Sequence, residues 1–339
     1  MTKQTLIQKL GEVNFRHLIT QQHLGLEKHF REEYTPTEML AELKKRIKST
    51  RTDFRKLRNQ NINLQPYLEI GAEYGLRSCL LETAFDGRGF ALDLARAPLE
   101  AMPHFAKQFG FTKFPIRIVA DAHELPFSNQ TFAFVFCYQT LHHFPDPLPV
   151  VKEIWRVLKP GGWFFFSEEP VRQTFNLRLF RRPTKASGWN KLLKYSLLLP
   201  FISEIGKSEV DYGIAEEAFS LNLWQKLTRE FVDGTITISP FLVGRHLHLT
   251  NAQFKSKLEL PFTSKFSLTL FGGGISGLLR KNSGVQKTEP KRIFQCPNCH
   301  SKLTKINRRL TCLICQNSYM QTNGIWQLLT KDLNRKLYG

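Results

Sequence analysis

The architecture of this chain depends on the sequence Tyr67-Leu68-Glu69-Ile70-Gly71-Ala72-Glu73-Tyr74-Gly75, which Phe90-Ala91-Leu92-Asp93 follows after a helix-length interval. The order of residue types predicts a strand, a glycine turn, a helix from about Leu76 and a second strand that ends on a carboxylate. Glycine turns let a ligand approach the backbone closely, and the following helix directs its N-terminal amides at that ligand. A carboxylate at the tip of the second strand lies where a nucleotide-binding fold hydrogen-bonds a ribose. The stretch therefore predicts a nucleoside-cofactor site.

A dinucleotide is not the expected cofactor. Its G-x-G-x-x-G fingerprint needs a second glycine so that the backbone clears a pyrophosphate. Here the glycines are Gly71 and Gly75, and Glu73 stands between them. Because an acidic loop would oppose a pyrophosphate, the pattern favours a nucleoside cofactor without one.

The pattern E-x-G-x-x-x-G with a strand-end aspartate resembles the first two motifs of the class I S-adenosylmethionine (SAM) methyltransferases. Glu73 departs from that family, which usually has glycine in this position. Four later segments, in their order and spacing, resemble the methyltransferase core of the ubiquinone-biosynthesis type; they are residues 120–127, 132–135, 141–147 and 153–162. The resemblance extends over about residues 64–169.

The resemblance implies a set of cofactor-binding residues: Glu69, Gly71, Ala72, Gly75, Asp93, Leu94, Asp121, Ala122 and Gln139. Gly71 and Gly75 would line the methionine end of SAM. Asp93 would accept from the ribose hydroxyls and Asp121 from the adenine amino group. Ala122 would pack beside the adenine ring, and Gln139 would lie beneath the methionyl group. Glu69 would help to orient the amino group of the cofactor, directly or through water.

Strands alternate with helices from residue 64 to residue 167, which predicts an α/β fold with a doubly wound, mostly parallel, Rossmann-like sheet. The apolar run Phe-Ala-Phe-Val-Phe-Cys-Tyr at 132–138 is typical of a strand covered on both faces. Two more strands, near residues 234–238 and 267–271, are expected to complete the sheet.

Changes of composition divide the chain. Residues 1–62 are polar and predicted helical, and we expect them to cap the cofactor site or to contribute on the substrate side. The methyltransferase domain is expected over residues 63–281, with a lid or substrate insertion at about 170–230, as is common after the fifth strand in this family. Residues 282–292 read as a polar linker before a small domain at 293–332.

Four of the six cysteines lie close together near the C-terminus: Cys296, Cys299, Cys312 and Cys315. They form two C-x-x-C pairs with twelve residues between them, a spacing that surrounds one tetrahedral Zn²⁺. A site filled by four thiolates has no open position, so the zinc is expected to be structural. With its tail, this segment resembles the zinc-ribbon activator subunit of tRNA and protein methyltransferases.

Methyl transfer from a sulfonium is an in-line displacement in which positioning matters most, so a general base is optional. The candidates are His142 and His143 after the fourth strand and Glu168 or Glu169 after the fifth. Amino-methylases of nucleic-acid bases typically carry an Asn/Asp-Pro-Pro-Tyr/Phe clamp after the fourth strand. This chain has Tyr-Gln-Thr-Leu there, at residues 138–141, which weighs against methylation of a base nitrogen.

The net charge of +19 suits an anionic partner such as RNA or a membrane surface, and equally suits a basic protein with no such partner. No apolar run reaches the length of a transmembrane helix or a signal peptide, so we expect a cytoplasmic protein. The leading hypothesis is a SAM-dependent methyltransferase with a small-molecule or a carrier- or lipid-linked acceptor. The alternatives are an RNA methyltransferase and a non-catalytic SAM-binding regulatory module.

Overall fold

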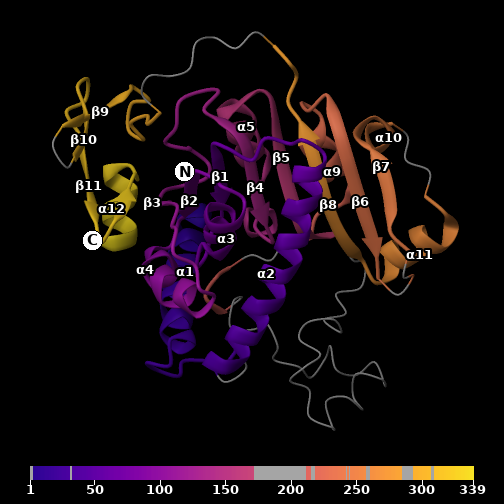
Figure 1. The fold of residues 1–339 in the computed structure, drawn as a ribbon, viewed down its shortest axis with the longest axis horizontal. Helices are drawn as coiled ribbons and strands as arrows, with labels where there is room; N and C mark the ends of the chain where they lie inside the picture. Colours follow the sequence, from indigo (N-terminus) through magenta and orange to yellow (C-terminus); the bar gives the residue numbers. More distant parts are fainter. Residues whose placement is uncertain are drawn as a thin grey trace.

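The computed structural model describes residues 3–30, 33–171, 211–214, 218–241, 243, 245–256, 260–284, 293–306 and 309–339. Its centre is a twelve-stranded sheet in the order β7-β6-β8-β5-β4-β1-β2-β3-β12-β11-β10-β9 (Figure 1). The first five strands along the chain are β1 (Tyr67–Ile70), β2 (Gly89–Asp93), β3 (Ile116–Val119), β4 (Phe132–Tyr138) and β5 (Leu158–Val171). They are all parallel, which agrees with the predicted Rossmann-like fold.

Helices join these parallel strands: α3 (Leu76–Ala84), α4 (Arg96–Gln108) and α5 (Leu148–Val157). Every residue of β4 is buried. Val135 and Cys137 of this strand belong to one hydrophobic core, whereas Phe134 and Phe136 belong to another. Because successive side chains of a strand point to opposite faces, the sheet is covered on both sides, as a doubly wound fold requires.

The far part of the sheet contains β6 (Asp233–Pro240) and β7 (Leu247–Thr250), with α9 (Leu221–Thr228) before them and α10 (Asn251–Lys255) after them. The strand expected near residues 234–238 is therefore present.

The strand expected at residues 267–271 was wrong, because most of that segment lies in α11 (Phe262–Leu270). Its buried residues Ser264, Ser267 and Leu268 have helical rather than alternating spacing. The strand is instead β8 (Gly273–Arg280), antiparallel between β5 and β6. A Cβ on Gly277 would lie 2.4 Å from the Phe166 ring, so the glycine-rich sequence is what allows β8 to pack against β5.

Two helices precede the sheet, α1 (Lys3–His23) and α2 (Pro36–Asn59). A capping box of Thr35 and Glu38 begins α2, with Pro36 in its first turn. The two helices cross the lower part of the fold in Figure 1, next to α3 and α4. α2 packs against one face of the sheet, where the Phe54 ring contacts the rings of Phe134 and Phe136 of β4.

The C-terminal segment joins the same sheet. Its elements are β9 (Leu303–Ile306), β10 (Arg309–Cys312), β11 (Ser318–Thr322), β12 (Ile325–Gln327) and α12 (Lys331–Tyr338). β12 pairs in parallel with β3, and the yellow strands of Figure 1 continue the sheet from that edge. The amide of Leu328 donates to the carbonyl of Val119 over 2.8 Å. Sequence analysis did not anticipate this pairing, and α12 extends past the expected domain end at residue 332.

Candidate functional site

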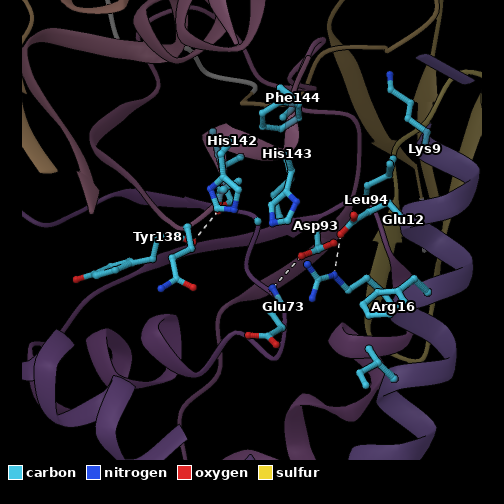
Figure 2. Close-up of a pocket in the computed structure, with 18 of the residues that line it drawn as sticks. Lys9, Glu12, Arg16, Glu73, Asp93, Leu94, Tyr138, His142, His143 and Phe144 are labelled. Carbon is cyan, nitrogen blue, oxygen red and sulfur yellow. Dashed lines mark hydrogen bonds and ion pairs between the residues drawn. The ribbon is translucent and has the colours of Figure 1, made fainter. Parts of the chain in front are cut away.

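A cavity of about 500 Å³ lies at the carboxyl ends of β1 to β4. Open α/β sheets bind their ligands at this edge. Gly71, Asp93, Asp121 and Gln139, each just past or at the end of a different strand, line the cavity. On the opposite side, α1 presents the side chains of Lys9, Glu12 and Arg16 (Figure 2). The cavity is thus enclosed between the strand ends and the N-terminal helix.

The turn after β1 is closed by two tight contacts. Gly71 has a φ of +67°, and a Cβ there would lie 2.5 Å from the Thr140 side chain. Only glycine therefore lets this turn approach the end of β4. The backbone N–H of Glu73 donates to Oδ2 of Asp93 over 2.8 Å, which holds the turn against the end of β2.

Asp93 is a partly buried acceptor that lines the cavity. Its Oδ1 accepts from the amide of Ala95 at 2.9 Å, and its Oδ2 accepts from the amide of Glu73. Burial raises the pKa of Asp93 to about 6, although both amides act in the other direction. Each carboxylate oxygen has two lone pairs, so Asp93 keeps acceptor capacity for a ligand.

Asp121 is held by two cationic or ionisable neighbours. Its Oδ1 lies 2.8 Å from Nδ1 of His123, and its Oδ2 accepts from the ammonium of Lys9 on α1. Burial acts to raise the pKa of Asp121, but His123 and Lys9 hold it well below its usual range. Asp121 is therefore a permanent carboxylate at neutral pH, linked directly to the covering helix.

Glu73 stands where the resemblance leads one to expect glycine, and its negative charge is balanced by an arginine of α2. Its carboxylate lies 3.1 Å from the Arg46 guanidinium of α2. Burial alone would raise the pKa of Glu73, but Arg46, followed by Arg16 and Arg77, lowers it. The residue also has a φ of +51°, which L-residues rarely adopt. The ion pair explains how an acidic side chain is tolerated in this turn.

The predicted cofactor residues do not all reach the cavity. Those that line it are Gly71, Asp93, Leu94, Asp121, Ala122 and Gln139, whereas Glu69, Ala72 and Gly75 do not. Glu69 is buried and accepts from the amide and hydroxyl of Ser78 at 3.1 and 2.6 Å. Burial raises the pKa of Glu69 to about 7. Its carboxylate thus supports the start of α3, and the structure does not bring it to the position expected for the amino group of SAM.

Of the predicted base candidates, two line the cavity and two do not. His142 and His143 line the cavity from a short 3₁₀ turn, Leu141–His143, and their ring centroids lie 4.3 Å apart. Glu168 lies outside the cavity, where its carboxylate accepts from the Gln139 amide at 2.8 Å. Glu169 is fully buried and lies 2.9 Å from Nδ1 of His142.

Sequence analysis missed the cavity residues contributed by helices. They include Lys9, Glu12, Arg16 and His23 of α1, Arg46 of α2 and Arg77 of α3. Tyr138 at the end of β4 was missed as well. Lys9, Glu12 and Arg16 are spaced by three and four residues, which places them on one helix face. In a sequence such a stripe has the same appearance as a solvated surface, so no local signal distinguished it.

The charges of the cavity fit SAM. Its lining contains six carboxylates, Glu12, Glu33, Glu42, Glu73, Asp93 and Asp121, and four Lys or Arg side chains, Lys9, Arg16, Arg46 and Arg77. SAM carries a sulfonium and an ammonium against one carboxylate, so an excess of carboxylates suits it. The volume also lies within the range of roughly 300–1,000 Å³ typical of small-molecule sites.

The four C-terminal cysteines form one cluster. The sulfur atoms of Cys296, Cys299, Cys312 and Cys315 all lie within 4.8 Å of one another. The distances are 3.5 Å between Cys296 and Cys315 and 3.4 Å between Cys299 and Cys312. Sulfurs bound tetrahedrally to zinc at about 2.3 Å lie roughly 3.8 Å apart, so this donor set fits Zn²⁺.

Comparison with known proteins identifies the central part of the chain. Residues 68–166 match the family model for the methyltransferase domain. The chain is 27% identical over 160 residues to the ubiquinone biosynthesis O-methyltransferase of Pseudomonas fluorescens, covering 39% of this chain and 66% of the relative. It is also 27% identical over 180 residues to the biotin biosynthesis bifunctional protein BioHC of Teredinibacter turnerae, covering 51% and 31%. The prediction of a class I SAM methyltransferase domain is therefore confirmed for this part of the chain.

The curated relatives are matched over limited lengths, since the chain spans between about a third and two thirds of these two proteins. Among solved structures, a protein described as a putative sarcosine dimethylglycine methyltransferase from Galdieria sulphuraria is 16% identical. The match covers 80% of this chain and 99% of that chain with a TM-score of 0.45. Within the described residues, no helix combines the length and apolarity needed to cross a membrane.

Proposed function

We propose that this protein is a SAM-dependent methyltransferase acting on a small-molecule, carrier-linked or lipid-linked acceptor. One observation carries the proposal: Gly71, Asp93 and Asp121, which lie at or just past the ends of β1, β2 and β3, line one cavity. The methyltransferase-domain match over residues 68–166 includes all three strand ends. The excess of carboxylates in the lining supports a cofactor with net positive charge.

Each of these residues then has a role. Asp93 accepts from the ribose hydroxyls, Asp121 accepts from the adenine amino group, and Gly71 lies against the methionyl part. When bound, SAM supplies an electrophilic methyl group on its sulfonium. Lys9 already donates to Asp121, so adenine must share this carboxylate with Lys9 or displace it. The N-terminal helix is in this way part of the cofactor site.

The cysteine cluster is proposed to hold one structural zinc ion. Four thiolates close the coordination sphere, which leaves no position for a substrate or a reactive water. We propose domain limits of 1–62, 63–281 and 293–339, with α12 included in the last. Much of the lid expected at about residues 170–230 lies outside the described residues, so it stays a prediction.

Calorimetry with SAM and S-adenosylhomocysteine tests the cofactor assignment. We expect micromolar binding to the zinc-loaded wild type and loss of binding in Asp93→Ala. The matched control is Asp86→Ala, because the Asp86 side chain is 83% exposed and does not line the cavity. A folded wild type that binds neither ligand would contradict the proposal.

Methyl transfer from labelled SAM into an extract of the source cells then separates the alternatives. Label in small molecules or lipids supports the proposal, whereas label in RNA would favour the RNA methyltransferase. Binding of SAM without any incorporation would favour a non-catalytic module.

A further inference from the structure

We propose that Arg77 binds an anionic group of the methyl acceptor, and that the acceptor therefore carries a carboxylate or a phosphate. Arg77 would be a residue that selects the acceptor and would take no part in the transfer of the methyl group. The inference rests on the proposed methyltransferase function and names the chemical class of its acceptor.

Arg77 is the cation of the cavity that lacks a counter-ion. Four Lys or Arg side chains line the cavity, and three of them are in ion pairs, namely Lys9 with Asp121, Arg16 with Glu12 and Arg46 with Glu73. The side chain of Arg77 forms no hydrogen bond or ion pair with any residue that the structure describes, and its Nε is buried without a partner. The cavity thus contains one guanidinium with unused donors.

The neighbouring carboxylates do not neutralise Arg77. Glu69 accepts from the amide and hydroxyl of Ser78, and burial raises its pKa to about 7, so that it is only partly ionised at neutral pH. Asp53 accepts from the hydroxyl of Tyr138 at 3.2 Å. Arg77 is only 9% exposed, and a guanidinium stays charged when it is buried. Because a buried charge without a counter-ion is costly, an anionic ligand would complete this site.

The guanidinium is held where a ligand can reach it. Arg77 lies in the first turn of α3, and its guanidinium carbon lies 4.3 Å from the centroid of the Tyr138 ring. An aromatic ring attracts the cation but accepts none of its N–H groups in the plane of the guanidinium. These N–H groups form a fork that matches the two oxygens of a carboxylate or a phosphate. The N-terminal amides of α3 add to the positive potential.

The order of the strands places Arg77 on the acceptor side of the cavity. In the proposed function, the adenine lies by the end of β3, the ribose by the end of β2 and the methionyl part by the end of β1. The next strand in the sheet is β4, and Tyr138 is its last residue. In Figure 2, Tyr138 lies across the cavity from Lys9, which contacts Asp121 at the adenine end. The end of β4 is therefore the place that remains for the acceptor.

The carboxylate of SAM is the other anion to consider. The methionyl part would lie against the turn that contains Gly71 and Glu73. Burial acts to raise the pKa of Glu73, and of the three arginines that lower it, Arg46 and Arg16 have larger effects than Arg77. Arg46 and Arg16 are thus the cations closer to the turn, and Arg77 is left for a second ligand.

The first test separates the two anions by calorimetry of the zinc-loaded protein with SAM and with decarboxylated SAM. We expect Arg77→Gln to bind SAM within about threefold of the wild type, because loss of a charge-assisted contact to SAM would cost roughly 10–100-fold. Such a loss for SAM, with unchanged affinity for decarboxylated SAM, would assign Arg77 to the cofactor and overturn the inference. The matched control is Arg88→Gln, because Arg88 is exposed and does not line the cavity.

The second test determines the charge of the acceptor. Metabolites and lipids of the source cells, freed of protein and RNA, are divided on an anion exchanger at neutral pH and incubated with labelled SAM. We expect methylated products only from the retained fraction. Arg77→Gln should need roughly 10–100 times more of this fraction for its half-maximal rate, with a smaller change in the maximal rate. Arg77→Lys should recover part of the loss, since it keeps the charge.

Stability distinguishes a binding residue from a structural one. In the absence of ligands, Arg77→Gln should not lower the unfolding midpoint, because it removes a buried charge that has no counter-ion. A lower midpoint together with weaker SAM binding would reduce Arg77 to structural support of α3 and overturn the inference.

The remaining outcomes separate the inference from the proposed function. Acceptor activity in the unretained fraction, or an Arg77→Gln variant with an unchanged requirement for the retained fraction, would overturn the inference while leaving a methyltransferase. A wild type that binds no SAM would refute the proposed function and the inference with it. Phosphatase treatment of the retained fraction then identifies the anion: loss of acceptor activity assigns a phosphate, and unchanged activity assigns a carboxylate.

Discussion

At the scale of single residues, Asp93 has opposite effects on stability and on binding. Burial raises its pKa from 3.8 to about 6 in the folded protein. The folded state therefore holds this proton more tightly than the unfolded state, and the stabilisation is complete below pH 4 and lost as the pH rises through about 6. A ribose hydroxyl, however, is bound best by the ionised carboxylate. The ionised form of Asp93, which binds the ligand best, therefore makes the ligand-free protein less stable.

A pH dependence of cofactor binding follows from Asp93. At pH 5 only about a tenth of a carboxyl group with a pKa near 6 is ionised, so SAM affinity should fall roughly tenfold between pH 7.5 and pH 5. Calorimetry at both pH values measures this ratio. Asp93→Asn should bind SAM weakly at both pH values, with no tenfold difference between them. The control Asp86→Asn, at an exposed position, should show the same tenfold difference as the wild type. A wild type with pH-independent affinity would show that Asp93 does not contact the ligand.

The Glu73–Arg46 pair predicts a compensating double substitution. Arg46→Met should lower the free energy of unfolding by about 3 kcal/mol, because it leaves Glu73 charged and without its ion-pair partner. Adding Glu73→Gly should recover most of this loss, since it removes the charge and relieves the positive φ. Urea denaturation measures both values. The control is Arg55→Met, an exposed arginine of the same helix. If the double variant is as unstable as Arg46→Met, the ion pair is not what accommodates Glu73.

At the scale of elements, the sequence predicted those strands, turns and helices that depend on residues close together along the chain. The β1-α3-β2 unit was evident because its strand, turn and helix signals follow one another within 27 residues, from Tyr67 to Asp93. The place of α1 over the cavity was only one of two roles considered for residues 1–62, because it depends on contacts such as Lys9 with Asp121, 112 residues apart. Glu169 was likewise only one of two alternative base candidates after the fifth strand, Glu168 or Glu169. Its buried place could not be predicted, because the backbone amides that it binds, those of Thr140, Leu141 and His142, lie on the turn after another strand.

The helix α12 is predicted to affect cofactor binding from outside the cavity. The hydroxyl of Tyr338 donates to the carbonyl of Leu94 at 2.5 Å and accepts from the amide of Arg96 at 3.1 Å. Leu94 lines the cavity directly after Asp93. Tyr338→Phe should therefore lower the free energy of unfolding by about 1–2 kcal/mol and weaken SAM binding several-fold.

Urea denaturation and calorimetry on the same samples check the Tyr338 prediction. Arg335→Ala is the matched control, because its side chain lies on the same helix and is 79% exposed. A Tyr338→Phe variant that loses stability but binds SAM with unchanged affinity would contradict the link between α12 and the cavity.

At the scale of the whole molecule, the cysteine-rich segment and the methyltransferase domain share one sheet. The four cysteines predicted a compact module, but no sequence signal indicated where it would attach. The attachment consists of backbone pairing between β12 and β3, which any two strands of suitable length can form. Side chains then support it: the Arg117 guanidinium of β3 donates to the carbonyl of Asn323 at 2.8 Å.

A shared sheet predicts that metal removal affects the entire chain. We expect the zinc-loaded protein to unfold in one cooperative transition, and chelation to lower its midpoint by on the order of 10 °C. Without the metal, the segment loses the constraint that closes it, and β3 is left as an unpaired edge. Calorimetry and hydrogen exchange of the β3 amides measure both effects. Zinc, but not magnesium, should reverse them, and Cys312→Ser should reproduce them without chelator. Two separate transitions, of which only the smaller responds to chelation, would mean that the β12–β3 pairing does not couple the two parts.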